Sequence, residues 1–176
     1  QIYVHRTQGT IVEGNLVFHA ETPLAQQFFR GGTQSDCIVV NAEAQFGDAI
    51  TNRDITIFNN LVANSKNNIA LWGNQGTAVP TANVLIAHNT LLDAENAGLL
   101  IRNSSILRGV QIVNNIIDQS GGGVVLEGPS SYGNNVTFSN NLWSSQPPSV
   151  VQSEGDQLDK LFSTPLPQPL CGFDTY

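Results

Sequence analysis

An asparagine recurs along this chain inside the same short apolar frame, and this recurrence limits the fold more than any other feature. The frame is clearest in NVLIAHNTLLD (83–93). It returns in DITIFNNLVAN, GVQIVNNIIDQ and NVTFSNNLWSS, with a fainter copy, GTIVEGNLVFH, near the start. The successive asparagines are 45, 29, 26 and 26 residues apart: Asn15, Asn60, Asn89, Asn115 and Asn141. A period of this size predicts repeated units that stack on one another.

Apolar residues alternate around each asparagine. Of the ten positions five and three residues before the asparagines, nine are apolar, and Thr10 is the exception. Such alternation is typical of strands with one buried face. Another strand precedes each frame, and we expect one pair of its side chains to turn inward. The expected inward pairs are Ile2 and Val4, Ile38 and Val40, Ile69 and Leu71, Leu99 and Ile101, and Val124 and Leu126.

A unit of about 25 residues with three short strands cannot bury its apolar side alone, so it must stack on copies of itself. Stacking places equivalent asparagines about 4.8 Å apart, the distance between neighbouring strands. At this distance their side-chain amides can bond up and down the stack and form a ladder. The bend between strands suits asparagine, because this residue tolerates positive φ.

The frame resembles the right-handed parallel β-helix repeat family, which includes pectate lyases, polygalacturonases, alginate lyases and epimerases. The resemblance covers about residues 1–153, and LIAHNTLLDAENAGLLIRN (85–103) is its best stretch. It implies an all-β, right-handed, single-stranded parallel β-helix with about 5–6 coils, three short strands per coil and an Asn ladder. We expect the β-helix over 1–155 and an irregular capping tail over 156–176, with upstream coils or a cap in the full protein.

Composition narrows the function. Charged residues make up 12% of the chain and the net charge is −7, which argues against nucleic-acid binding. No apolar run is long enough to span a membrane. Scarce lysine and abundant Asn, Gly, Thr and Val favour a secreted or cell-surface protein. Cys37 and Cys171 form either a long-range disulfide or two buried thiols, and we favour the thiols.

One outward column of the strand that precedes each frame is polar and aromatic. It contains His5, Asn41, Trp72, Arg102 and Glu127. Such a surface holds sugar rings by stacking and hydrogen bonding, and in the resembling family polysaccharide lies beside this sheet. We therefore expect a polysaccharide or oligosaccharide ligand, with Asp48 and Glu43 overhanging the same groove. The neighbouring outward column is apolar and should be covered by a loop, an upstream segment or a packing partner; it includes Val39, Leu100 and Val125.

Catalysis has weaker support. Glu127 and Glu43 are the candidates for a paired-carboxylate hydrolase, and Arg102 is the candidate base of a lyase or epimerase. No Asp cluster supports a Ca²⁺ site, and three scattered histidines do not make a metal site, so we predict no metal and no cofactor. The catalytic residues of the family match no position here. Three functions therefore stay open: carbohydrate binding, polysaccharide cleavage or epimerisation with a site partly outside this sequence, and a structural spacer.

Overall fold

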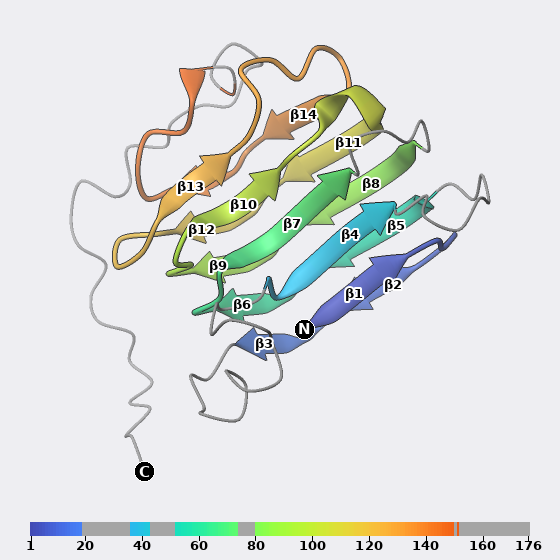
Figure 1. The fold of residues 1–176 in the computed structure, drawn as a ribbon. Coiled ribbons are helices and arrows are strands. Elements are labelled where there is room, and N and C mark those ends of the chain that lie inside the picture. Colours follow the sequence, from blue (N-terminus) through green and yellow to red (C-terminus); the bar gives the residue numbers. More distant parts are fainter. Residues whose placement is uncertain (19–35, 43–51, 74–79, 150, 152–176) are drawn as a thin grey trace, which may run out of the picture.

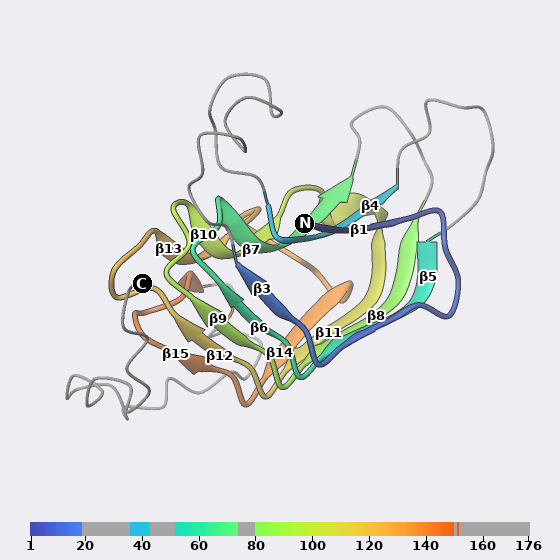
Figure 2. The same ribbon diagram turned by 90° about the horizontal axis from the view of Figure 1, so that it is seen from below.

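The computed structural model describes residues 1–18, 36–42, 52–73, 80–149 and 151, and its chain winds as a parallel β-solenoid (Figure 1). Three strands form each coil, and equivalent strands pair in parallel with those of the next coil. Figure 2 shows the resulting three walls. The expected all-β class and the three strands per coil are confirmed. The predicted tail over 156–176 lies outside the described residues.

The three walls are five-stranded sheets, which we name A, B and C. Sheet A contains β1 (Ile2–His5), β4 (Ile38–Ala42), β7 (Asn67–Gly73), β10 (Ala97–Ile101) and β13 (Val124–Glu127). Sheet B contains β2 (Ile11–Glu13), β5 (Asn52–Phe58), β8 (Thr81–Ala87), β11 (Leu107–Val113) and β14 (Val136–Ser139). Sheet C contains β3 (Leu16–Phe18), β6 (Leu61–Ala63), β9 (Thr90–Leu92), β12 (Ile116–Asp118) and β15 (Leu142–Trp143). A short 3₁₀ turn, Ser104–Ile106, joins β10 to β11.

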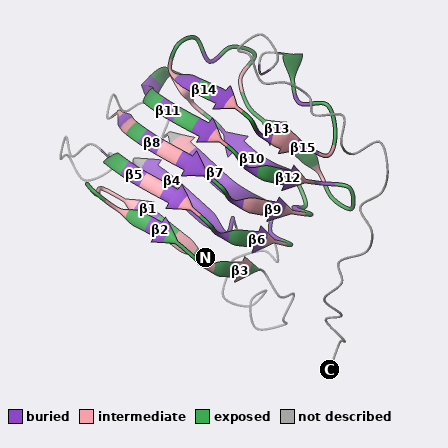
Figure 3. Ribbon diagram, turned by 180° about the vertical axis from the view of Figure 1, so that it is seen from behind, coloured by how far each residue is buried: buried purple, intermediate pink, exposed green. Residues whose placement is uncertain are grey.

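The interior of the coil is a column of aliphatic side chains from all three sheets. Ile38 and Ile69 from sheet A, Ile57 from sheet B, and Val62 and Leu91 from sheet C are all fully buried. Figure 3 shows buried positions among more exposed ones along β5 and β11 of sheet B, whereas β10 of sheet A is buried throughout. The last coil fills this space with rings, since Tyr132 and Phe138 lie 5.3 Å apart and Phe138 and Trp143 lie 6.2 Å apart. Burial of apolar surface, repeated coil by coil, is what holds the strands together.

The five asparagines form the predicted ladder at the turn between sheets B and C. The Nδ2 atoms of Asn15, Asn60, Asn89 and Asn115 each donate to Oδ1 of the next asparagine, at 2.9, 2.9, 3.0 and 2.9 Å. The same Oδ1 atoms also accept the backbone N–H of the preceding asparagine, at 2.9–3.1 Å. Each of these Oδ1 atoms therefore accepts two hydrogen bonds from the preceding coil, one from a side chain and one from the backbone.

The expected reason for asparagine at this turn is wrong in one respect. The ladder residue is not the one with positive φ; the residue before it is. That preceding position holds Gly14, Asn59, His88, Asn114 and Asn140, with φ between 54° and 66°. The left-handed residue makes the bend, and the ladder asparagine is selected for its side-chain amide.

Strand β13 has a different register from the predicted one. We expected Val124 and Leu126 to match Leu99 and Ile101. Instead Val124 pairs with Ala97 and Leu126 with Leu99. The glycines before β13 belong to a tight turn: Gly123 donates its N–H to Ala94 O at 2.7 Å, and a Cβ on Gly123 would lie 2.0 Å from Asn96 O. The register shifts because this turn takes up residues that the pattern assigned to the strand.

Cys37 is a free, buried cysteine that lies directly before β4. Burial raises the pKa of its thiol, although a hydrogen bond with Ser65 opposes the shift. Cys171 lies outside the described residues. No helix within the described ranges has the length and apolar character needed to cross a bilayer.

Candidate ligand-binding face of sheet A

The outer face of sheet A places four of the predicted ligand residues side by side. His5 pairs with Asn41, and Asn41 pairs with Trp72. Arg102 directly follows Ile101, which pairs with Leu71, and so it stands next to Trp72. These residues come from four successive coils at the same end of their strands. We call this group, together with Tyr3, the sheet A face.

Trp72 is the centre of the sheet A face. Its indole packs against the buried side chains of Val39, Ala70 and Leu100. Its Nε1 donates a hydrogen bond of 3.0 Å to Oδ2 of Asp36, which lies just before β4. The guanidinium carbon of Arg102 lies 4.6 Å from the centre of the ring, which is the geometry of a cation–π contact. The ring is therefore held at its edge by an acid and covered on a face by a cation.

The other aromatic pair of the face is Tyr3 and His5. Their ring centres lie 5.9 Å apart with an angle of 28° between the planes. Asn41 joins them from the next coil, since its Nδ2 donates to Tyr3 Oη at 2.8 Å and its carbonyl oxygen accepts from His5 Nδ1 at 3.0 Å. Asn41 is buried, whereas Tyr3 is 47% exposed. Asn41 thus orients the pair, and the rings present the surface.

The apolar outward column of sheet A, which we expected to need a cover, is buried at three positions. Val39, Ala70 and Leu100 are at most 3% exposed, and Trp72 packs over them. A side chain of the sheet itself therefore supplies part of the cover that we assigned to a partner. Val125 does not belong to this column, because it lies in the interior cluster next to Leu126. This prediction is wrong, and so is the inward position expected for Val124, which is 52% exposed whereas Val125 is 2% exposed. A register shift of two residues does not exchange the faces of a strand, so the start of β13 departs from regular alternation as well.

Glu127 does not stand in line with Arg102, as the sequence pattern suggested. It pairs with Leu100 and is exposed at the end of the apolar column. The shifted register of β13 moves it away from the polar column. Glu43 and Asp48 lie outside the described residues, so the proposed pairing of Glu43 with Glu127 is not part of the described site.

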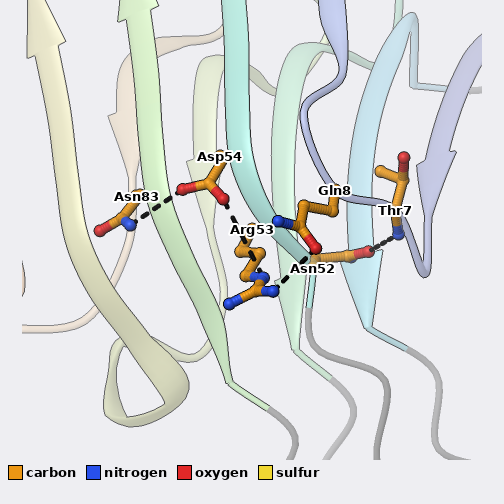
Figure 4. Close-up of polar contacts among 6 residues, drawn as sticks. All are labelled: Thr7, Gln8, Asn52, Arg53, Asp54 and Asn83. Carbon is orange, nitrogen blue, oxygen red and sulfur yellow. Dashed lines mark hydrogen bonds and ion pairs between the residues drawn. The ribbon is translucent and has the colours of Figure 1, made fainter.

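A second polar group lies at the corner between sheets A and B (Figure 4). Buried Asn52 accepts the N–H of Thr7 at 3.0 Å and donates to the carbonyl oxygen of Asn41 at 2.6 Å. Outside it, Arg53 donates to Gln8 at 2.8 Å, and Asp54 accepts from Asn83 at 3.0 Å. The bond from Asn52 to Asn41 lies within one coil, and the other three link neighbouring coils, so this corner supports the backbone beneath Asn41.

The residue that sequence reasoning missed is Asp36. It precedes the strand, it has no equivalent in the other coils, and its role depends on the folded position of Trp72. The only signal was a carboxylate directly before the apolar run CIVVN. Within the described ranges, no three His, Cys, Asp or Glu side chains gather as a metal site. The described geometry offers aromatic surface and a cation for binding.

The fold and the Asn ladder define the class of this protein: it is a parallel β-helix, or β-solenoid, with three sheets. No protein-family model matches the chain, and neither the curated proteins nor the solved structures gave a match.

Proposed function

We propose that this chain is a carbohydrate-binding β-helix of a secreted or cell-surface protein, related to pectate-lyase-like solenoids, and that the sheet A face holds a polysaccharide or oligosaccharide. The observation that supports it most is the contact of Arg102 with the Trp72 ring at 4.6 Å, with Asn41 one coil and the Tyr3–His5 pair two coils away from Trp72. Aromatic surface beside hydrogen-bond donors suits sugar rings and their hydroxyl groups.

Arg102 is the main donor that this face offers. It is exposed, and in the described part of the chain its guanidinium donates no hydrogen bond and pairs with no carboxylate. A guanidinium carries five N–H groups in a fixed plane. The indole covers one side of this group, and the oxygens of a bound glycan would accept its N–H donors.

The test is affinity gel electrophoresis against neutral and acidic polysaccharides. We expect the wild type to be retarded by at least one of them, and Arg102→Ala or Trp72→Ala to lose the retardation. Arg108→Ala is the matched control, because Arg108 is an exposed arginine on sheet B that donates to the carbonyl oxygens of Ser105 and Leu107. Retardation by no polysaccharide, or equal loss in the Arg102 and Arg108 variants, would contradict the proposal.

The same samples separate binding from turnover. Release of reducing ends or of unsaturated uronates, abolished by Arg102→Ala, would favour a lyase, epimerase or hydrolase. Retardation without release supports a binding module.

A further inference from the structure

Asp36 has an unusual environment for a carboxylate. It is 7% exposed, and no cation pairs with it in the described part of the chain. Its two oxygens instead accept hydrogen bonds from two neutral groups of β7: Oδ1 from Asn67 Nδ2 at 2.7 Å and Oδ2 from Trp72 Nε1 at 3.0 Å. A buried carboxylate is costly unless its oxygens are well bonded. Among the described residues, hydrogen bonds and not an ion pair hold this carboxylate.

The two donors lie near opposite ends of β7. Asn67 is the first residue of the strand, and Trp72 is the sixth. To reach Asp36, the indole of Trp72 must fold back along the outer face of sheet A. It then covers Val39, Ala70 and Leu100, against which it packs. The hydrogen bond at Nε1 thus selects one orientation of a large ring that would otherwise have several rotamers at the surface.

The fixed ring in turn sets the position of Arg102. Cation–π attraction requires the guanidinium to lie over the ring face, and it lies 4.6 Å from the ring centre. The described contacts of the Arg102 side chain are with this ring. If the indole moved, Arg102 would lose the surface on which it rests.

We propose that Asp36 is a positioning residue for the sheet A face: its carboxylate holds Trp72, and Trp72 holds Arg102 in the orientation that meets a ligand. The part of this inference that concerns ligand affinity rests on the proposed function. The part that concerns the orientation of Trp72 does not.

The chain is suited to a direct test, because it contains only two tryptophans. Trp143 is 2% exposed in the last coil, and Trp72 is half-buried. In a Trp143→Phe background, Trp72 is the only indole. We expect its fluorescence to be weakly quenched by iodide, and its Nε1–H to exchange slowly with solvent in ¹⁵N spectra. In Asp36→Ala we expect stronger quenching, red-shifted emission and fast exchange of this proton.

Two further variants separate positioning from general loss of stability. Asp54→Ala removes an exposed carboxylate of sheet B that accepts from Asn83 and should leave the indole signals unchanged. Asp36→Asn should keep them near those of the wild type. Its Oδ1 still accepts from Trp72, and its Nδ2 can donate to Asn67 Oδ1, a buried atom with no hydrogen-bond partner, once the Asn67 amide flips.

Ligand binding gives the second readout. With a polysaccharide that retards the wild type, we expect Asp36→Ala to weaken affinity about tenfold, or about 1.4 kcal/mol, while the protein still unfolds cooperatively. If the quenching, emission and Nε1–H exchange of Trp72 in Asp36→Ala equal those of the wild type, the inference that Asp36 positions Trp72 is wrong. If no polysaccharide binds the wild type, the proposed function fails, and the indole signals still decide whether Asp36 positions Trp72.

Discussion

The side-chain amide of Asn60 donates to Oδ1 of Asn89 at 2.9 Å, although the two residues are 29 positions apart. The same oxygen accepts the backbone N–H of Asn60 at 3.1 Å. Asn89 in turn donates to the carbonyl oxygens of Ile57 and Ala87. One buried side chain thus joins two coils and closes its own turn, which leads to the first prediction.

Replacing Asn89 with alanine should reduce the free energy of unfolding by about 3 kcal/mol or more, because several buried donors and acceptors lose their partners at once. The measurement is urea denaturation followed by circular dichroism. Asn15→Ala is the control: Asn15 is only half-buried, so its replacement should cost about 1 kcal/mol. Equal losses for the two variants would contradict the ladder as a main source of stability.

Gly123→Ala should destabilise the protein by about 2–3 kcal/mol. The new methyl group would lie 2.0 Å from the carbonyl oxygen of Asn96, and this backbone atom cannot move without disturbing β10. Gly14→Ala is the matched control, since no atom lies within 4 Å of the position of the new Cβ. Only the φ of +66° at Gly14 opposes the methyl group, and we expect this to cost about 1 kcal/mol of stability. Thermal unfolding of both variants measures the difference, and a milder effect at Gly123 than at Gly14 would argue against this turn.

His88→Val should cost about 1–2 kcal/mol, although the side chain is exposed. Its φ is 54°, a region that a β-branched residue rarely enters. His88→Asn should be close to neutral, because Asn59, Asn114 and Asn140 occupy the same position in other coils. Urea denaturation of the two variants checks this, and similar stabilities would mean that the backbone here is not restrictive.

The buried thiol of Cys37 should make stability depend on alkaline pH. Burial raises its pKa above the usual 9.0 in the folded protein. Above pH 9 the unfolded chain therefore loses the proton first, and stability falls as pH rises towards the folded pKa. In a Cys171→Ser background, melting temperatures from pH 7 to 10.5 should fall more steeply than in the same background with Cys37→Ala. Parallel curves would be inconsistent with a raised pKa.

The fold could be predicted because its signal is repeated. A single asparagine reads as a turn residue, but five in one register, each among alternating apolar residues, require a stack. The register of β13 could not be predicted, because Gly98, the first residue of GLLI, lies in its strand whereas Gly123 lies in the turn before β13. Both glycines lead an apolar run, and the contacts of Gly123 with Ala94 and Asn96, which appear only in the folded chain, distinguish it from Gly98.

The candidate site was predicted in part for a related reason. The alternation along sheet A is enough to align His5, Asn41, Trp72 and Arg102. Asp36 lies outside the alternation and acts through the indole of a neighbouring coil. Contacts that occur once in a repeat protein leave no periodic trace, so they appear only in the structure.

The asparagines of the ladder also share one orientation. From Asn15 to Asn115, the Nδ2 of each asparagine donates to the Oδ1 of the following one, and each of these accepting oxygens faces the preceding coil. Their amide dipoles therefore add along the solenoid axis, much as peptide dipoles add along a helix, with the negative end on the side of Asn15. An asparagine flipped within this row would set two donors or two acceptors against each other. The row of asparagines thus links the coils by hydrogen bonds and also gives the solenoid a dipole along its axis.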